Sequence, residues 1–286
     1  MKLMVTGASG QLGRELVELC ATRGVEVVGF DVESLDITNR DAVHAAVAEL
    51  APDVVVNCAA YTAVDACETN EDVALDVNAH AVRWIAEAVD AVGAHLVHIS
   101  TDYVFDGTLD RPYVESDPPN PRSAYGRTKL AGEREALALG SAATVVRTSW
   151  VCGFHGTNMV KTVLRLVGEN SPLSFVDDQV GHPTFTSDLA PALLLLAQDR
   201  RAGLFHVTNQ GAVSWCGFVG AILDVLGRDA TEVQPIATAD LDPPRPAPRP
   251  ANSVLENRAW RDAGYPPLRD FREPLRELVA RLTARH

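Results

Sequence analysis

The chain lacks the features that mark secreted, metal-binding and membrane proteins. Its five cysteines are an odd number and none lies in a Cys-x-x-Cys pair, which argues against a disulfide framework and a zinc site. No signal-peptide pattern precedes the apolar segment at residues 2–6. The longest apolar run, near residues 190–197, is interrupted by Pro191 and is too short to span a bilayer. We therefore expect reduced thiols, no metal site, no membrane partner and a cytoplasmic location.

Basic residues are also scarce. The chain carries 25 lysines and arginines against 38 aspartates and glutamates, so its formal net charge is -13. This balance predicts no nucleic-acid partner, because such partners require a basic surface. It still allows an anionic small substrate, because a few arginines inside a cleft can reverse the local potential.

What the sequence does contain is a regular alternation of strand and helix patterns over its first 150 residues. Apolar segments without polar alternation predict buried parallel strands at residues 3–6, 25–30, 53–58, 96–100 and 143–148. Helical spacing of apolar residues lies between them, at residues 11–23, 40–50, 72–92 and within 120–139. This order predicts an α/β fold with a Rossmann-like, doubly wound parallel sheet.

The alternation weakens after Trp150. We expect residues 1–150 to form a dinucleotide-binding domain and residues 151–286 to form a smaller, mainly substrate-binding region, with some segments returning to the first domain. Helices are expected at 160–166, 189–198, 218–226 and 271–285, and a strand at 204–208. The proline-rich segment 242–250 is either a stiff exposed spacer or a loop folded over a ligand, with Arg245 or Arg249 pointing inward.

A glycine-rich loop joins the first predicted strand to the first predicted helix. Gly7, Gly10 and Gly13 have the spacing G-x-x-G-x-x-G. Glycines at this place let the backbone approach a pyrophosphate, and the helix N-terminus supplies free N–H groups and positive potential. A tight turn without a ligand is the alternative, but the flanking strand and helix favour a dinucleotide cofactor.

Residues after the second and third predicted strands are candidates for the rest of the cofactor site. Asp31 closes the second strand, where an acidic residue binds the adenosine ribose hydroxyls and repels a 2′-phosphate. No arginine directly follows it, so NADH is favoured over NADPH. Asp36 and Ile37 are placed to flank the adenine. The small side chains of Ala59 and Ala60 after the third strand allow close contact with a cofactor, or merely close packing.

Tyr125 and Lys129 are candidates for the catalytic pair. They are four residues apart on a predicted helix and therefore share one face. A nearby ammonium stabilises a phenolate, so we expect Lys129 to lower the pKa of Tyr125. Thr101 ends the fourth predicted strand, where open α/β sheets bind ligands, and its hydroxyl could bond a substrate oxygen beside Tyr125. Capping of a turn is the alternative role for Thr101, and Ser100 is its competitor for the catalytic role.

With these motifs in place, the chain resembles the extended short-chain dehydrogenases/reductases and, within them, the dTDP-4-dehydrorhamnose reductases. The matching segments extend over nearly the whole sequence, at residues 7–13, 56–65, 100–107, 125–133, 147–151, 178–184 and 249–253. Three runs are more specific to this branch than the glycine loop is: S-T-D-Y-V-F-D-G from Ser100, R-T-S-W-V from Arg147, and D-D-Q-V-G-H-P-T, whose first aspartate is Asp177.

This resemblance implies the roles of individual residues. It implies Thr101, Tyr125 and Lys129 as the catalytic group, with Lys129 also holding the nicotinamide ribose. It implies a cofactor site that includes Gly10, Gln11, Leu12, Asp31, Ala60, Tyr61 and Thr62. It implies contacts to the sugar nucleotide from Thr101, Asp102 and Trp150, and we add Arg249 as a substrate-binding candidate. Core packing is the alternative role for Trp150.

The implied activity is the reduction of dTDP-6-deoxy-L-lyxo-4-hexulose to dTDP-L-rhamnose by NADH or NADPH, the last step of dTDP-rhamnose synthesis. Other nucleotide-sugar reductases or epimerases, and a non-catalytic dinucleotide-binding regulatory subunit, remain as alternatives. Some members of the family use magnesium at a dimer interface. No matching carboxylate pair is evident here, so no metal is assigned, and a homodimer is left open.

Overall fold

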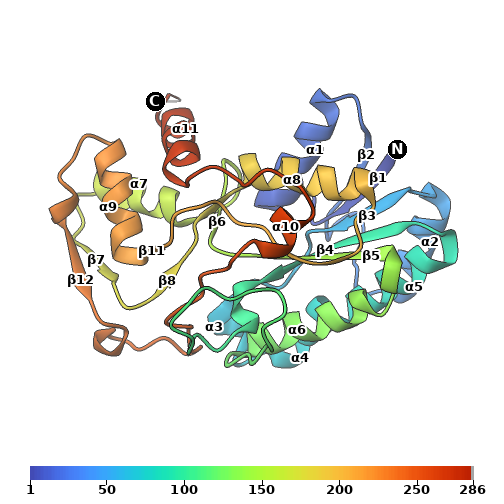
Figure 1. Cartoon of the computed structure of the whole chain (residues 1–286), viewed down its shortest axis with the longest axis horizontal. Helices are drawn as coiled ribbons and strands as arrows, with labels where there is room; N and C mark the ends of the chain where they lie inside the picture. Colours follow the sequence, from blue (N-terminus) through green and yellow to red (C-terminus); the bar gives the residue numbers. More distant parts are fainter. Residues whose placement is uncertain (285–286) are drawn as a thin grey trace.

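The molecule is built around one parallel sheet of six strands (Figure 1), and this computed structural model describes residues 1–284. The strands lie in the order β10-β5-β4-β3-β1-β2 and each pair of neighbours is parallel. They are β1 (Lys2–Thr6), β2 (Glu26–Phe30), β3 (Val54–Asn57), β4 (His95–Thr101), β5 (Ala143–Thr148) and β10 (Gly203–His206). The predicted fold class is confirmed.

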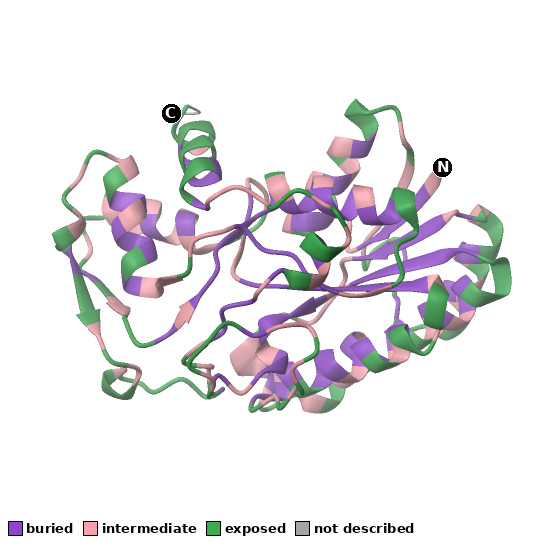
Figure 2. Ribbon diagram, viewed as in Figure 1, coloured by how far each residue is buried: buried purple, intermediate pink, exposed green. Residues whose placement is uncertain are grey.

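Helices cover both faces of the sheet because its central strands are apolar on both sides. Leu3 and Val5 of β1 point into a core formed with α1 (Gln11–Thr22) and α8 (Thr186–Asp199). Met4, between them, points into a second core on the opposite face. That face is covered by α2 (Arg40–Leu50), α5 (Ala81–Val92) and α6 (Ala124–Leu137), as Figure 2 shows by the buried strands between the helix layers.

The strand order places a cleft at the carboxyl edge of the sheet. The chain leaves β1 toward β2 on one side and returns to β3 on the other side of β1. The loops that follow β1 and β3 therefore separate at this point, which is where open α/β sheets bind ligands. Glycines and small residues follow both strands, at residues 7–10 and 58–60.

The helix predicted at residues 72–92 is divided into three parts. It consists of α4 (Glu71–Leu75), a π-helical turn (Asp76–His80) and α5, and the short helix α3 (Val64–Cys67) before it was not predicted. The apolar spacing within the segment gives no sign of a π turn, because a single turn of this kind shifts the helix face by only one residue. The helix expected within 120–139 begins at Ala124, where the Ser123 side chain accepts a hydrogen bond from Gly126 N at 3.1 Å.

The C-terminal part has its own core, packed around Phe218 and Phe271. Its helices are α7 (Met159–Gly168), α9 (Trp215–Val225) and α11 (Arg272–Thr283), whereas α10 (Arg258–Asp262) packs through Trp260 into the core shared with α1 and α8. Short strands pair in three small sheets that the sequence did not predict: β6 (Val151–Cys152) with β9 (Thr184–Phe185), β7 (Leu173–Val176) with β12 (Val233–Ile236), and β8 (Val180–Gly181) with β11 (Val213–Ser214). Residue 285, the last of the helix predicted at 271–285, lies outside the described residues.

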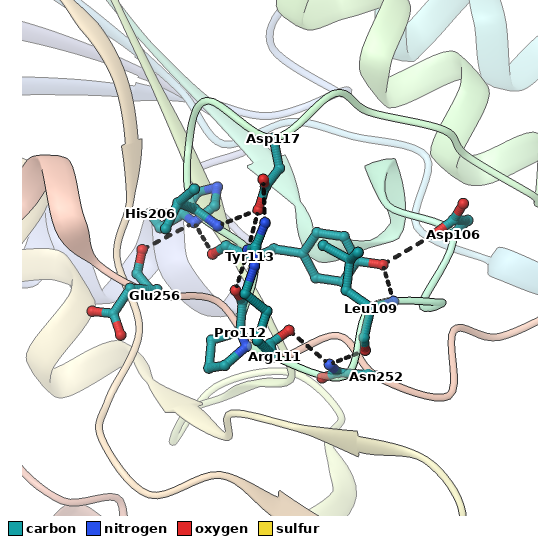
Figure 3. Close-up of polar contacts among 10 residues, drawn as sticks. Asp106, Leu109, Arg111, Pro112, Tyr113, Asp117, His206, Asn252 and Glu256 are labelled. Atoms are coloured by element: carbon teal, nitrogen blue, oxygen red, sulfur yellow. Dashed lines mark hydrogen bonds and ion pairs between the residues drawn. The ribbon is translucent and has the colours of Figure 1, made fainter.

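A network of polar contacts fixes the loop that follows β4 (Figure 3). The ring of Tyr113 stacks on Phe105, and its hydroxyl donates to Asp106 Oδ1 at 3.0 Å. Buried His206, at the end of β10, lies 3.1 Å through Nδ1 from the carbonyl oxygen of Tyr113 and 3.2 Å from that of Glu256. Burial lowers the pKa of His206 to about 3, so the ring is neutral and Nδ1–H is the donor. His206 thereby joins the loop that contains Tyr113 to the segment that contains Glu256.

Candidate functional site

A cleft of about 840 Å³ opens at the carboxyl ends of β1, β3, β4 and β5. It brings together most of the predicted site residues: Gly7, Gly10, Gln11, Leu12, Asp31, Asp36, Ile37, Ala59, Ala60, Tyr61, Thr62, Thr101, Asp102, Tyr125, Lys129 and Trp150. Two predicted residues, Gly13 and Arg249, do not line it. Several other residues that line the cleft were not predicted from the sequence, among them Ser149, Thr157 and Trp215.

The glycine loop is shaped to hold a pyrophosphate. Gly7 has a φ of 68°, and a Cβ there would lie 2.7 Å from Ala59 N. Gly10 caps α1 without a side-chain hydrogen bond, and the first turn of α1 carries no acidic residue. The helix therefore presents free N–H groups and positive potential to the cleft. A Cβ on Gly13 would lie 2.2 Å from Gly7 O, so Gly13 allows the helix to pack on the loop rather than lining the cleft.

The far end of the cleft is acidic. The Asp31 carboxylate accepts hydrogen bonds from Ser9 Oγ at 2.5 Å and from Glu33 N at 3.1 Å. The Ser9 hydrogen bond is the main cause of its lowered pKa, so Asp31 is charged at neutral pH. Among the described lining residues, Lys129 is the only lysine or arginine. A 2′-phosphate beside Asp31 would therefore find no arginine or lysine of the cleft lining to neutralise it. These loops and the helix N-terminus fit a dinucleotide with free ribose hydroxyls.

Close packing places Tyr125 beside the end of β4. A Cβ on Gly126 would lie only 2.2 Å from Tyr103 O, so glycine is needed for α6 to approach this segment. The ring of Tyr103 meets the Tyr125 ring edge-on, with 5.5 Å between centroids. Lys129, one turn further along α6, is buried and donates from Nζ to Ile99 O at 2.7 Å. Both side chains of the predicted pair thus reach the cleft.

The expected effect of Lys129 on Tyr125 is wrong for this geometry. Burial raises the pKa of Tyr125 above its ordinary value, and a hydrogen bond with Thr101 opposes the rise only in part. Lys129 is not among the main causes of the shift in the pKa of Tyr125. Burial also lowers the pKa of Lys129 to about 8, against the opposing charge of Glu133. Desolvation therefore outweighs the attraction between phenolate and ammonium on which the sequence argument relied.

The hydroxyls of Ser100 and Thr101 have different partners. Ser100 Oγ donates to Glu133 Oε1 at 2.6 Å and is thereby occupied away from Tyr125. Thr101 Oγ1 accepts from Tyr103 N at 3.2 Å and donates to Asp102 Oδ1 at 3.0 Å, and its hydroxyl lies close enough to Tyr125 to lower the pKa of the phenol against the effect of burial. Thr101 therefore caps a turn and also faces the tyrosine. The geometry favours Thr101 over Ser100 as the hydroxyl beside the reacting oxygen.

Asp102 is a buried carboxyl group in the wall of the cleft. Burial raises its pKa to about 6. Its Oδ2 atom has no hydrogen-bond partner at ordinary distance within residues 1–284, although the Ser253 side chain lies close enough to the carboxyl group to lower its pKa against the effect of burial. An unpaired buried acceptor costs free energy, so this oxygen is suited to receive a hydrogen bond from a ligand hydroxyl.

Two stacked tryptophans form another wall. The rings of Trp150 and Trp215 are 3.6 Å apart between centroids and 7° from parallel. Trp150 has a φ of 46°, which turns its side chain into the cleft directly after β5. A Cβ on Gly181 would lie 2.7 Å from the Trp150 ring, so glycine leaves room for it. Trp150 packs against the core of the C-terminal part and also lines the cleft. Its position is therefore compatible with both alternatives, core packing and contact with a substrate.

The Gln11 side chain faces the C-terminal part rather than the middle of the cleft. Its Oε1 accepts hydrogen bonds from Gly153 N at 3.1 Å and from Asn158 Nδ2 at 2.9 Å. A Cβ on Gly156 would lie 2.7 Å from Gln11 Cγ. Gln11 therefore joins the glycine loop to residues 153–158, and Thr157 of that loop also lines the cleft.

The proline-rich segment 242–250 folds back onto α3 and not over the cleft. Arg249 pairs with Asp65 through two hydrogen bonds of 2.6 and 2.8 Å, and Arg245 lies 3.8 Å from the same carboxylate. Neither arginine lines the cleft, so the structure does not favour the alternative of an inward arginine, and Arg249 as a substrate-binding residue stays a prediction. Arg249 also interacts electrostatically with Tyr103, whose ring contacts the ring of Tyr125. Its contact with the site is therefore indirect.

Residues 1–284 contain no group of three or more His, Cys, Asp or Glu side chains placed to hold a metal ion. Over the same part of the chain, no helix has both the length and the apolar composition required to cross a membrane.

Comparison with known proteins shows similarity along the whole chain. Residues 1–284 match the family described as RmlD substrate binding domain. The chain is 45% identical to a dTDP-4-dehydrorhamnose reductase of Streptomyces griseus, over 99% of this chain and 94% of that protein. It is 44% identical to a probable dTDP-4,6-dihydroxy-2-methyloxan-3-one 4-ketoreductase of Streptomyces antibioticus, over 97% of this chain and 94% of that protein.

Solved structures similar to this chain include proteins of the same name as these relatives. A dTDP-4-dehydrorhamnose reductase from Clostridium acetobutylicum superposes with a TM-score of 0.94 at 44% identity, covering 99% of this chain and 100% of that one. A second, from Bacillus anthracis in complex with NADP, has a TM-score of 0.93 at 37% identity, covering 98% of this chain and 100% of that one.

Proposed function

Because this chain belongs to the dTDP-4-dehydrorhamnose reductase family, we propose that it reduces the 4-keto group of a dTDP-sugar with NADH or NADPH. The substrate is dTDP-6-deoxy-L-lyxo-4-hexulose and the product is dTDP-L-rhamnose, so the reaction ends dTDP-rhamnose synthesis. The observation that carries the proposal is the cleft that places Thr101, Tyr125 and Lys129 beside a glycine loop built for a pyrophosphate.

The cofactor site extends from the glycine loop to Asp31. Gly7, Gly10 and the N-terminus of α1 hold the pyrophosphate, and the loop of Ala59–Thr62 lies beside it. Asp31 accepts the adenosine ribose hydroxyls, and its charge disfavours the 2′-phosphate of NADPH. NADH is therefore the preferred cofactor, although NADP is bound in the Bacillus anthracis relative. Comparing kcat/KM for NADH and NADPH tests this preference.

The residues around the ketone have separate tasks in the reduction. When bound, the reduced nicotinamide supplies the hydride for C4 of the sugar. Tyr125, which burial keeps protonated, donates its phenolic proton to the oxygen at C4. The Thr101 hydroxyl orients that oxygen. The Lys129 ammonium would hold the nicotinamide ribose.

The sugar is held by the opposite wall. Asp102 Oδ2, which lacks a partner in the described chain, accepts a sugar hydroxyl. The face of Trp150 covers the apolar side of the hexose, a contact common between aromatic rings and sugars. Arg249 acts on this wall from behind, through Tyr103.

The decisive experiment is a turnover assay. Purified protein with dTDP-6-deoxy-L-lyxo-4-hexulose should consume NADH, followed as loss of nicotinamide absorbance, and should form dTDP-L-rhamnose. If neither NADH nor NADPH is consumed, the proposal is wrong. Turnover would also exclude a regulatory subunit that binds dinucleotide without reaction. An epimerase would instead retain its NAD through gel filtration and need no added cofactor.

A second candidate is reduction of a different dTDP-4-keto sugar. The Streptomyces antibioticus relative is named as a ketoreductase for another dTDP-sugar at nearly the same identity. A 40% identical relative of Streptomyces niveus is named dTDP-4-keto-6-deoxy-D-glucose reductase. Competition between the two 4-keto sugars in one assay, with products separated by chromatography, distinguishes these substrates.

Two further assignments accompany this function. Residues 1–150 form the dinucleotide-binding domain, and residues 151–286 mainly bind the sugar nucleotide, although α8 and β10 pack with the first sheet. The five cysteines, all free thiols, suit a cytoplasmic location. Light scattering of the purified protein would test the homodimer that the sequence leaves open.

A further inference from the structure

A buried ion pair lies directly beneath the catalytic residues. Glu133 and Arg147 have side chains only 2% and 3% exposed. Arg147 Nε and Nη2 donate to the two oxygens of Glu133, both at 2.7 Å. Ser100 Oγ donates to the same carboxylate at 2.6 Å. One carboxylate from α6 therefore receives hydrogen bonds from both β4 and β5.

This carboxylate occupies a particular place relative to the reacting groups. Glu133 follows Lys129 by one turn of α6, and Ser100 and Arg147 are register partners in the β4–β5 pair. Lys129 Nζ donates to Ile99 O, the residue before Ser100. Two hydrogen bonds, Lys129 with Ile99 and Glu133 with Ser100, therefore join α6 to adjacent residues of β4.

Stability alone gives a weak reason for this arrangement. Removing two charges from water costs several kcal/mol per ion, and well-packed apolar pairs of similar volume are often as stable or more stable. Arg147 Nη1 has no partner within residues 1–284, which adds to the cost of burial. A costly network that contacts the catalytic helix and strand points to a role in the reaction.

We propose that Glu133 is a positioning residue of the reductase, which sets the catalytic end of β4 against α6 and holds the Lys129 ammonium in its charged form. This inference rests on the proposed function. Ser100 transmits the position of Glu133 to Thr101, and the two hydrogen bonds from Arg147 keep the Glu133 carboxylate aligned.

The charge of Lys129 depends on few neighbours. The titratable groups facing it are Cys58 after β3, His98 on β4, and Tyr125 and Glu133 on its own helix. Burial lowers the pKa of Lys129, and the charges of Glu133 and Cys58 raise it, with Glu133 the larger of the two. Arg147 is not among the charges that shift the pKa of Lys129. Loss of the Glu133 carboxylate therefore makes the lysine lose its proton at lower pH.

The test uses a variant that removes both charges and keeps the volume. A single Glu133→Gln change leaves Arg147 buried without its partner and is expected to destabilise the fold. The double variant Glu133→Met/Arg147→Met avoids this and should melt within a few degrees of the wild type. We expect the alkaline limb of its kcat/KM profile to move roughly one pH unit lower, the scale of a nearby opposite charge.

Two matched variants separate the possible roles. Arg83→Met/Glu135→Met removes an ion pair of 2.6 Å between α5 and α6 that does not line the cleft, and should leave the profile unchanged. Ser100→Ala removes the link to β4 without changing charge. It should lower kcat several-fold, as expected for a lost hydrogen bond, and leave the alkaline limb in place.

A measurement independent of turnover keeps the inference separate from the proposed function. The dissociation constant of NADH, followed by energy transfer from tryptophan, should increase as the pH is raised and Lys129 loses its proton. In Glu133→Met/Arg147→Met this increase should begin at a lower pH than in the wild type. If the double variant keeps the wild-type pH dependence of both NADH binding and kcat/KM, Glu133 is only structural and the inference is overturned. If the wild type binds NADH but reduces no dTDP-sugar, the function fails while the binding profiles still decide the role of Glu133.

Discussion

At the scale of the residue, burial decides the chemistry of the site. Tyr125 was selected for its spacing from Lys129, but its surroundings raise its pKa instead of lowering it. A protonated phenol is the form that a reduction requires, because the oxygen at C4 must gain a proton. The raised pKa therefore suits the donor role in the proposed direction of reaction.

Replacement of Tyr125 by phenylalanine removes this donor and retains the ring that packs on Tyr103. We expect Tyr125→Phe to lower kcat at least ~10²-fold, in line with lost general-acid assistance, with NADH binding nearly unchanged. Tyr265→Phe, which removes a hydroxyl bonded to Asp199 away from the cleft, is the matched control. Wild-type kcat in Tyr125→Phe would assign the proton to another group.

The raised pKa of Asp102 leads us to expect that sugar binding depends on pH. Its pKa, raised by burial to about 6, means that the carboxylate is present above that pH and is lost as the pH falls through it. Because the charged form is the stronger acceptor for a sugar hydroxyl, KM for the sugar should rise as the pH falls through about 6. Asp102→Asn should have a high KM that does not vary over the same range. A wild-type KM that is flat with pH would contradict this.

At the scale of the element, the π turn connects the cofactor loop with the catalytic helix. Asn78 lies in this turn and is fully buried. Its side chain accepts from Tyr61 N at 2.9 Å and donates to Tyr61 O at 3.2 Å and Thr128 Oγ1 at 3.1 Å. A Cβ on Gly132 would lie 2.0 Å from Asn78 O, so α6 packs very closely on the turn. The turn thus sets the distance between the cofactor loop and α6.

Truncation of Asn78 should loosen this connection. We expect Asn78→Ala to lower the free energy of unfolding by about 1–3 kcal/mol, the cost of leaving buried backbone groups of Tyr61 unpaired. The KM for NADH should rise more than kcat falls, because the Tyr61 loop belongs to the proposed cofactor wall. Asn70→Ala, at an exposed position before α4, is the control. Equal stability and KM in Asn78→Ala and the wild type would refute this role.

At the scale of the whole molecule, a few polar contacts hold the C-terminal part against the dinucleotide half. Gln11 accepts hydrogen bonds from Gly153 and Asn158, and His155 Nε2 lies 3.1 Å from Glu18 on α1. Residues 153–158 also contribute to the cleft. The two halves of the proposed site therefore meet along α1, from Gln11 to Glu18.

Removal of the Gln11 side chain tests this connection. Gln11→Ala should raise KM for both NADH and the dTDP-sugar several-fold, the scale of one lost hydrogen-bonding group, because both walls of the cleft lose their common support. Gln198→Ala, at an exposed position on α8, should have no effect. A change confined to the KM for NADH would show that Gln11 serves the cofactor alone.

The sequence predicted the parts of the fold that depend on local pattern. The buried strands, the glycine loop and the spacing of Tyr125 and Lys129 are all encoded within a few adjacent residues. The short strands β6 to β9, β11 and β12 were missed, because two to four residues have too little periodicity to detect. Trp215 was missed for another reason: its stacking on Trp150 joins residues far apart in the chain.

What the sequence alone determined was the α/β class, the place of the dinucleotide loop and the spacing of Tyr125 and Lys129, the proposed catalytic pair, because each follows from residue type at short spacing. Only the tertiary structure decided that Ser100 bonds Glu133 while Thr101 faces Tyr125, and that Arg249 pairs with Asp65 outside the cleft. It also reversed the expected pKa shift of Tyr125. Hydrogen-bond partners and desolvation depend on which distant segments fold together, and spacing along the chain does not contain that information.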